Sequence, residues 1–600
     1  MGRLTAAVLV LATGFSFAVV PSTGHAIQPP PDNAAVLDDI DAYIGQAMEE
    51  WKIPGLAIAV VQDGEVILSK GYGYRDLDEQ LPVTASTLFA IGSISKSFTV
   101  TLLGMLEDEG KVDWDEPVRR YLPDFVLYDD VATEYMTPRD LVTHRSGLPR
   151  HDLLWYGSDL TRRDLYERLR YIEPNREFRE VFQYQNLMFM TAGYLAGQIE
   201  GKSWEALVRE RVFEPLAMSG SNFSVDVSQK SDDFSYPYAE NDGVVQQIDF
   251  RNIDEVGPAG SINSSVEEMI RYVQLHINKG ELGEEQILSS GNAEQMQMPQ
   301  MAIRGTIQYD ELGHTSYGMG FFVTSYRGRK LVHHGGGIDG FISLLSFIPS
   351  ENVGMIVLTN KSGNNPVPTV VTRGVYDRVL GLDPVDWVGR VKEQQARAEE
   401  AEQEGEEEGG PVQGTSLSHE LADYAGDYAH PAYGVVRIEV DGGNLRATFN
   451  DISVPLEHFH YDVFEIAEDP MVPASGIKVM FRYDKQGDID ELHVPLEPAV
   501  EDILFKRVAN ESMREHAFLE PFVGEYDLGG VVMAVALRGD DTLTLTVPGQ
   551  PTYELVPTRG TSFDLKGLSG YSAEFRRDET GAVSELVLAQ PNGTFVAQRK

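Results

Sequence analysis

The sequence predicts an α+β domain followed by two related all-β modules. Two short strand-like runs, residues 56–61 and 66–68, flank Asp63 and Gly64 as in a β-hairpin. Comparable runs return only at residues 330–358, and the sequence between has mostly helical patterns. The simplest arrangement is one antiparallel sheet built from both ends of the domain, with the helices inserted between them.

The chain repeats itself in its C-terminal third. Residues 421–428 match residues 519–526, and Leu445 matches Leu543 at the same offset of 98 positions. Alternating apolar residues predict that both modules are all-β, as small barrels or sandwiches. Aromatic residues at the matching positions are expected in the module cores: Tyr424, Tyr428, Phe522 and Tyr526.

The N-terminus has the features of a secretory signal. Arg3 is followed by the apolar run 4–20 and by small residues before Ala26. A membrane anchor is the alternative, which the short and interrupted apolar run disfavours. We expect cleavage near Ala26 and a periplasmic or secreted protein with no membrane span after signal removal. The expected units are the signal peptide 1–26, the α+β domain 36–385, an acidic linker 386–418, β module 1 at 419–510 and β module 2 at 516–600.

Composition limits the partners and cofactors. The formal net charge of −44 argues against a nucleic acid or an anionic membrane as partner, since both would repel such a surface. The chain has no cysteine, which excludes disulfides and thiolate metal sites. His458 and His460 have same-face strand spacing, but the sequence places no third ligand beside them. We therefore expect no metal and no cofactor.

Ser93 and Lys96 form a Ser-x-x-Lys pattern at the start of a predicted helix. Gly92 ends an extended segment and a long apolar run follows, so Ser93 is expected as the first helical residue. Residues i and i+3 share a helix face, which places the Lys96 amine beside the Ser93 hydroxyl. A second copy, Ser475 and Lys478, lies in strand-like sequence, where the two side chains would point to opposite faces.

Two later motifs complete a candidate site. Tyr184 and Asn186 precede a predicted helix, and three glycines follow His334, where they let the backbone approach a ligand. This order of motifs resembles the serine β-lactamase and penicillin-binding protein superfamily, in particular its class C and D-aminopeptidase or esterase branch. Residues 141–149 and 257–261 also resemble that family.

The resemblance covers about residues 36–385 and implies a β-lactamase/transpeptidase-like fold with serine hydrolase activity. It assigns Ser93 as the acyl-forming nucleophile, and leaves open whether Lys96 or Tyr184 is the base. The backbone N–H groups of Ser93 and Gly337 would form the oxyanion hole. The other site residues that the resemblance implies are His334 as a catalytic residue and Asn186, Gly335 and Gly336 as substrate-binding residues.

His334 stands where many β-lactam-recognising members carry a lysine. A neutral histidine lacks the permanent cation that would hold a substrate carboxylate. We therefore expect a small-molecule or peptide substrate of the amide, peptide or ester class that contains a D-amino acid, with peptidoglycan fragments as a further partner. His333 is the alternative to His334, because neighbours on a strand point to opposite faces. The alternative functions are a β-lactamase or D-alanyl-D-alanine carboxypeptidase, and a non-catalytic cell-wall-binding protein.

Overall fold

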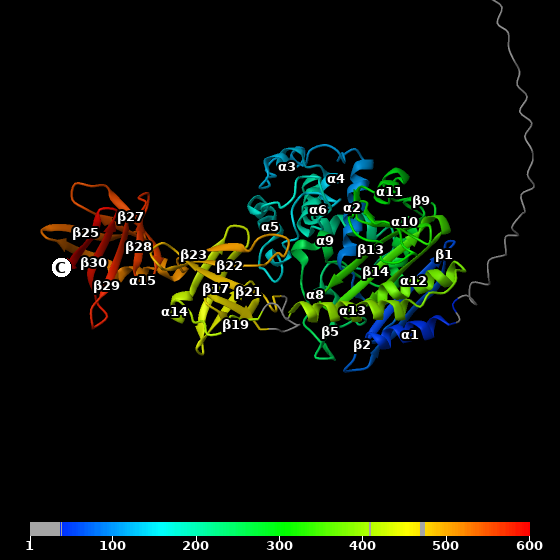
Figure 1. Cartoon of the computed structure of the whole chain (residues 1–600). Coiled ribbons are helices and arrows are strands. Elements are labelled where there is room, and N and C mark those ends of the chain that lie inside the picture. Colours follow the sequence, from blue (N-terminus) through cyan, green and yellow to red (C-terminus); the bar gives the residue numbers. More distant parts are fainter. Residues whose placement is uncertain (1–36, 38, 407–409, 468–473) are drawn as a thin grey trace, which may run out of the picture.

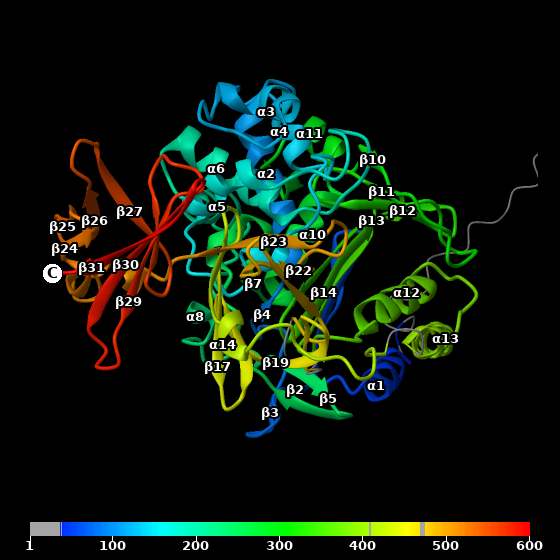
Figure 2. The same cartoon turned by 60° about the vertical axis from the view of Figure 1, so that its left-hand side comes forward.

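The computed structural model describes residues 37, 39–406, 410–467 and 474–600, which form an α+β domain and two closed β barrels (Figure 1). Barrel 1 lies between the α+β domain and barrel 2, and Figure 2 shows the same molecule turned by 60°. The predicted signal peptide lies outside the described residues. Within these residues, no helix combines the length and the apolar character that a membrane crossing requires.

A nine-stranded sheet of antiparallel pairs forms the centre of the α+β domain. β1 (Gly55–Gln62) pairs with β15 (Val353–Thr359), so the two ends of the domain meet inside one sheet, as the sequence predicts. β1 and β2 (Glu65–Asp76) form the predicted hairpin. The remaining strands are β3 (Leu81–Pro82) beyond β2 and, from the other edge inward, β10 (Met301–Ala302), β11 (Ser316–Tyr317), β12 (Phe322–Tyr326), β13 (Arg329–Ile338) and β14 (Phe341–Ile348).

Helices cover both faces of the sheet because β1 is apolar at nearly every position. Its alternate residues enter two separate hydrophobic cores. On one face, α10 (Val266–Ile277) packs against β15, and α2 (Ser95–Asp108) packs on α10 through stacked Phe98 and Tyr272 rings. The helices of the other face are α1 (Ile40–Glu50), α12 (Val367–Val379) and α13 (Trp387–Glu406).

The segment expected as an acidic linker that starts partly helical contains helix α13 over most of its length. Its first residue, Trp387, is fully buried and donates its indole N–H to Asp377 Oδ2 at 3.0 Å. The helix therefore begins as part of the packed α+β domain, and the chain leaves that domain later than the composition shift suggests.

The two β modules are closed barrels of eight strands, each closed by pairing of its first and last strands. In barrel 1 the Tyr428 hydroxyl donates to the Tyr424 carbonyl at 2.8 Å, and in barrel 2 Tyr526 donates to Phe522 at the same distance. All four rings are fully buried, which confirms the predicted aromatic cores. The strands are β16 (Gly426–His430), β17 (Gly434–Asp441), β18 (Asn444–Phe449), β19 (Ile452–His460), β20 (Val463–Ile466), β21 (Lys478–Tyr483), β22 (Ile489–Val494) and β23 (Ile503–Val508), then β24 (Gly524–Leu528), β25 (Val531–Arg538), β26 (Thr542–Thr546), β27 (Thr552–Arg559), β28 (Ser562–Leu565), β29 (Ser572–Arg577), β30 (Val583–Gln590) and β31 (Gly593–Arg599).

Both copies of the Ser-x-x-Lys pattern differ locally from expectation. Ser93 lies in a 3-10 turn, Gly92–Ile94, and α2 begins at Ser95. Gly92 has a φ of +53° and packs so closely on β13 that a Cβ there would lie 2.8 Å from Gly337 N, so this turn requires glycine. In barrel 1 only Lys478 is in a strand, and Ser475 lies in the preceding turn.

Candidate active site

Lys96 is at the centre of the candidate site. Its Nζ lies 3.0 Å from Ser93 Oγ, 2.6 Å from Asn186 Oδ1 and 2.7 Å from the Ala259 carbonyl oxygen. The side chain is fully buried, and this burial, reinforced by the nearby Arg150 cation, holds the pKa of Lys96 well below its usual range. The amine and the hydroxyl therefore have the arrangement of a base and a nucleophile.

Three acceptors hold the Lys96 amine in place. Its Nζ donates to Asn186 Oδ1 and to the Ala259 carbonyl oxygen, both of which can only accept. It also donates to Ser93 Oγ, so the amine and the serine hydroxyl are in direct contact. The Asn186 amide is oriented by a second hydrogen bond, from its Nδ2 to Asp152 Oδ1 at 2.8 Å. The amine is thus fixed against the serine hydroxyl.

Tyr184 lies on the other side of the serine. Its phenol is hydrogen-bonded to Ser93, and Lys96 Nζ lies 4.8 Å from the centre of its ring. The ring also stacks on His144, with ring centres 4.2 Å apart. Burial raises the pKa of Tyr184 above its usual value, so the group remains a phenol near neutral pH and can donate a proton.

The glycines of β13 bring its backbone against the serine turn. β12 pairs with β13 only as far as His333, so the rest of that edge is available to the turn. A Cβ on Gly336 would lie 1.9 Å from the Ile91 carbonyl oxygen, which only glycine avoids. The Gly337 N–H thereby comes beside Gly92 and next to Ser93. Gly337 lines the cavity in front of the serine, whereas Gly335 and Gly336 lie behind it and set the backbone approach.

His334 is a buried neighbour of the site and is not among the residues that line the cavity. Its Nδ1–H donates to the Gly335 carbonyl at 2.6 Å, and its Nε2 accepts from the Tyr317 hydroxyl at 3.0 Å. Burial lowers the pKa of His334 to about 3, so the ring is neutral at physiological pH. Phe322 contacts both His333 and His334, but His334 also contacts the rings of Tyr317 and Tyr184, which identifies it as the neighbour that faces the site.

A cavity of about 320 Å³ opens over Ser93. Its wall combines apolar side chains with three charged groups, so the space suits an organic substrate with a polar or charged end. The lining residues are Gly92, Ser93, Arg150, Asp152, Trp155, Tyr156, Asn186, Ile253, Val256, Ala259, Gly260, Gly337, Ile338, Asp339, Ile342 and Ser362.

Comparison with protein-family models gives the identity of the fold. Residues 40–378, more than half of the chain, match the model described as Beta-lactamase. The chain belongs to the Beta-lactamase family. The match confirms the resemblance seen in the sequence motifs, and makes this protein a β-lactamase-fold serine hydrolase. Residues 411–507, which include barrel 1, match a domain of unknown function, DUF3471.

Relatives and solved structures agree with this Beta-lactamase family fold. The chain is 27% identical to unguisins hydrolase ungD′ of Aspergillus campestris, over 78% of this chain and 92% of the relative. It is 29% identical to unguisins hydrolase ungD of Aspergillus violaceofuscus, over 70% and 80% respectively. The octameric penicillin-binding protein homologue from Pyrococcus abyssi is 22% identical and superposes with a TM-score of 0.51, over 78% of this chain and 100% of that chain, which shows a shared fold.

Two charged residues of this Beta-lactamase family site were missed at the sequence level. Arg150 donates from Nε to Asp152 Oδ2 at 2.7 Å, and its guanidinium carbon lies 4.8 Å from the Tyr184 ring centre. Asp152 in turn fixes Asn186. Arg150 directly follows the family-like segment 141–149, and that position was the only signal available. The site therefore has a cation even though His334 supplies none.

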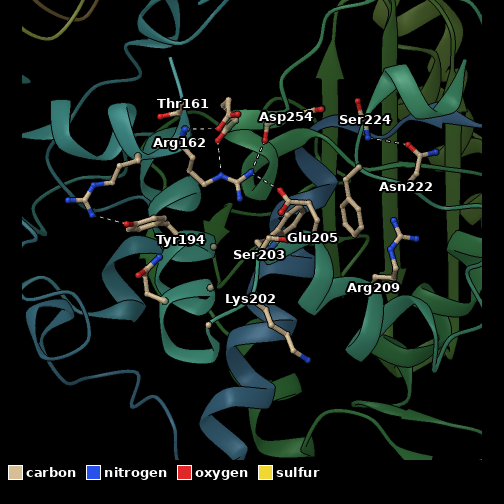
Figure 3. Close-up of a pocket in the computed structure, with 18 of the residues that line it drawn as sticks. Thr161, Arg162, Tyr194, Lys202, Ser203, Glu205, Arg209, Asn222, Ser224 and Asp254 are labelled. Atoms are coloured by element: carbon tan, nitrogen blue, oxygen red, sulfur yellow. Dashed lines mark hydrogen bonds and ion pairs between the residues drawn. The ribbon is translucent and has the colours of Figure 1, made fainter. Parts of the chain in front are cut away.

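Arg162 positions one wall of the site from outside. It begins α5 (Arg162–Arg168) and points between Glu205 and Asp254 (Figure 3). Its guanidinium donates to Glu205 Oε1 and to the Asp254 carbonyl, both at 2.7 Å, and to the Glu255 carbonyl at 2.9 Å. The side chain is mostly buried.

The segment that Arg162 holds leads directly to the lysine. The turn η7 (Asp254–Val256) continues into α9 (Gly257–Gly260), whose Ala259 carbonyl accepts from Lys96. Arg162 therefore sets the position of a Lys96 acceptor without touching the cavity. Within the described ranges, no cluster of three or more His, Cys, Asp or Glu side chains is arranged to hold a metal ion.

Proposed function

We propose that the protein hydrolyses an amide, peptide or ester of a D-amino acid through a covalent acyl-enzyme at Ser93. The main support is the Ser93–Lys96 pair, with a fully buried amine 3.0 Å from the hydroxyl at the base of an open cavity. The family resemblance of the motifs supports the D-amino acid class, and two relatives are hydrolases by name.

The proposed reaction starts when Ser93 Oγ attacks the substrate carbonyl carbon and its proton passes to Lys96 Nζ. The N–H groups of Ser93 and Gly337 bind the oxyanion, an interaction for which loss of one donor typically costs about 3 kcal/mol. The proton then moves through Tyr184 to the leaving nitrogen or oxygen, and water later releases the acyl group. The lowered pKa of Lys96 and the raised pKa of Tyr184 both favour this division of roles.

Steady-state hydrolysis of D- and L-alanine p-nitroanilide tests the proposal. The wild type should prefer the D-isomer, and Ser93→Ala should abolish turnover while the thermal unfolding profile stays unchanged. Ser475→Ala, in the second Ser-x-x-Lys copy, is the control and should retain full activity. Turnover that survives Ser93→Ala in a pure sample would exclude the mechanism, and preference for the L-isomer would exclude the substrate class.

Arg150 favours a second candidate, a β-lactamase or D-alanyl-D-alanine carboxypeptidase. Its guanidinium lines the cavity and could hold the substrate carboxylate that His334 cannot. If this is the activity, a penicillin should acylate Ser93, and Arg150→Met should slow that acylation at least tenfold. No penicillin adduct on the wild type would leave the first proposal standing. A non-catalytic cell-wall-binding protein would show neither a fluorophosphonate adduct on Ser93 nor turnover, while peptidoglycan fragments still bound.

We also propose that the protein is exported. The support is the pattern of residues 1–26, with Arg3, the apolar run 4–20 and small residues before Ala26. N-terminal sequencing of the protein recovered from its native host tests this, and a retained Met1 would contradict it.

A further inference from the structure

One short segment separates the substrate cavity from barrel 1. Residues 150–157 supply four cavity-lining residues: Arg150, Asp152, Trp155 and Tyr156. Two residues between them, His151 and Leu153, contact the barrel. His151 adopts a left-handed conformation, with φ +50°, its N–H donates to Glu497 Oε2 at 2.8 Å, and its Nδ1 lies 2.7 Å from the Tyr433 hydroxyl. The same backbone therefore has one side in the site and the other on barrel 1.

Leu153 anchors this segment in the barrel itself. It is the one α+β-domain residue, among the described residues, that lines the apolar space inside barrel 1, where it joins Val436, Ile438 and Leu492. The barrel core and the core beneath the active site form one continuous hydrophobic cluster. Leu153 is partly buried in this contact, and the shared core shows that the two units are packed together and not merely tethered.

The β18–β19 turn of barrel 1 holds the backbone of the segment. Asn450 Nδ2 donates to the Tyr156 carbonyl at 3.0 Å and to the Leu153 carbonyl at 3.3 Å, and the Asp451 N–H donates to the Gly157 carbonyl at 3.0 Å. A Cβ on Gly157 would lie 1.7 Å from Asp451 Oδ1, so the turn sits against the segment with no room for a side chain. Three backbone carbonyls beside the cavity wall thus depend on two barrel residues.

A chain of charged groups continues from the same turn to the opposite rim. Arg251 donates from Nη1 to Asp451 Oδ2 at 2.5 Å and from Nε to Asp339 Oδ2 at 3.1 Å. Its guanidinium carbon lies 4.2 Å from the centre of the Tyr156 ring, and the Tyr156 hydroxyl donates to Asp339. Asp339 follows the oxyanion residue Gly337 by two positions. Asp451 therefore shares one cation with a carboxylate of the cavity rim.

We propose that barrel 1 is the outer support of the substrate cavity, and that Asn450 and Asp451 position the wall residues Trp155, Tyr156 and Asp339. This role rests on the proposed function and deepens it, because a fixed wall selects the substrate's side chain. It also assigns a role to barrel 1, which belongs to the segment matched by a domain of unknown function. The barrel supplies no lining residue of its own in the described structure, so it acts by positioning.

Hydrogen exchange and kinetics of the full chain test the proposal with Asp451→Asn. The control is Asp441→Asn, which removes a carboxylate paired with Arg446 in another turn of barrel 1. The Asp451 variant should exchange faster at residues 150–157, and KM for D-phenylalanine p-nitroanilide should rise about tenfold with kcat within about threefold. The Asp441 variant should match the wild type in both measurements.

Two further variants keep the test decisive. Asn450→Gly removes the hydrogen bonds to the Leu153 and Tyr156 carbonyls without removing a charge, glycine accepts the φ of +52° at this position, and the variant should reproduce the rise in exchange and in KM. Arg251→Gln combined with Asp451→Asn should be no worse than the more severe single variant, because both break one chain of contacts. If Asp451→Asn and Asn450→Gly both behave like Asp441→Asn, the barrel does not position the wall. If the wild type turns over no substrate, the proposed function fails, while the exchange measurement still decides the role of the barrel.

Discussion

Lys96 Nζ and Ser93 Oγ lie 3.0 Å apart, and the two other partners of the amine are both acceptors. In the proposed mechanism, the protonation state of Lys96 is therefore the main determinant of activity. A neutral amine can take the serine proton and an ammonium cannot.

The pH profile should follow that lysine. Burial lowers the pKa of Lys96 well below the usual 10.5, so kcat/KM should rise as pH rises through a midpoint far below 10.5 and then level off. Lys96→Met should lower kcat on the order of 10³-fold, and Lys96→Arg should be equally inactive because a guanidinium stays charged. An acid limb with its midpoint near 10, or a Lys96→Arg variant with substantial activity, would contradict this role.

Tyr184→Phe should affect substrates according to their leaving groups. An amine must be protonated as it leaves, so hydrolysis of a p-nitroanilide should fall on the order of 10²-fold or more. A p-nitrophenolate leaves without a proton, so the matching ester should lose less than about tenfold. Tyr194→Phe, which alters a tyrosine bonded to Arg163 outside the cavity, is the control. Equal losses on both substrates would mean that Tyr184 does not deliver the leaving-group proton.

Arg162→Gln should reduce kcat about tenfold with little change in KM, because it releases the turn that carries the Ala259 carbonyl. Loss of that acceptor disfavours the ammonium form, so the acid limb of kcat/KM should move to lower pH. Arg163→Gln changes the neighbouring residue, which pairs with Asp124 and Glu167 on the surface, and should leave both parameters unchanged. If Arg162→Gln, like the control Arg163→Gln, changes neither kcat nor the midpoint of the acid limb, Arg162 has no positioning role.

His276 should make the fold sensitive to acid. It is fully buried, and burial lowers its pKa from 6.5 to about 3. As pH falls below 6.5, His276 therefore binds a proton in the unfolded chain but not in the folded chain. The free energy of unfolding should then fall by up to about 1.4 kcal/mol for each pH unit, down to about pH 3. His276→Leu should remove this contribution, and the exposed His458→Leu should not. Denaturant unfolding at pH 7 and pH 4.5 measures how much the free energy of unfolding falls between the two pH values. The same fall in both variants would contradict the role of His276.

Local spacing was sufficient to predict that Ser93 and Lys96 lie side by side. A separation of three residues brings Lys96 to Ser93 whether the turn between them is α or 3-10, so the error in the helix start did not affect the site. The sheet was also predictable, because β1 and β15 are the two most continuous apolar strands and flank a helical region. The repeated tyrosine positions identified the barrel cores in the same way.

Long-range partners could not be predicted from one sequence. Arg251 and Asp451 are 200 residues apart, and neither belongs to a periodic pattern that would place it. The loop at residues 150–157 depends on a left-handed His151, a conformation that its residue type does not require. The alternation of side chains along a strand also could not tell whether His333 or His334 faces the site. The contact of His334 with Tyr317 distinguishes them.

The most direct test of the central claim is rapid-quench intact-mass spectrometry with D-alanine p-nitrophenyl ester, followed by peptide mapping. The account predicts that the protein gains the mass of one D-alanyl group, that the group maps to Ser93, and that Ser93→Ala gains none. Hydrolysis at a normal rate with no adduct at any quench time, or with the adduct on another residue, would contradict an acyl-enzyme at Ser93.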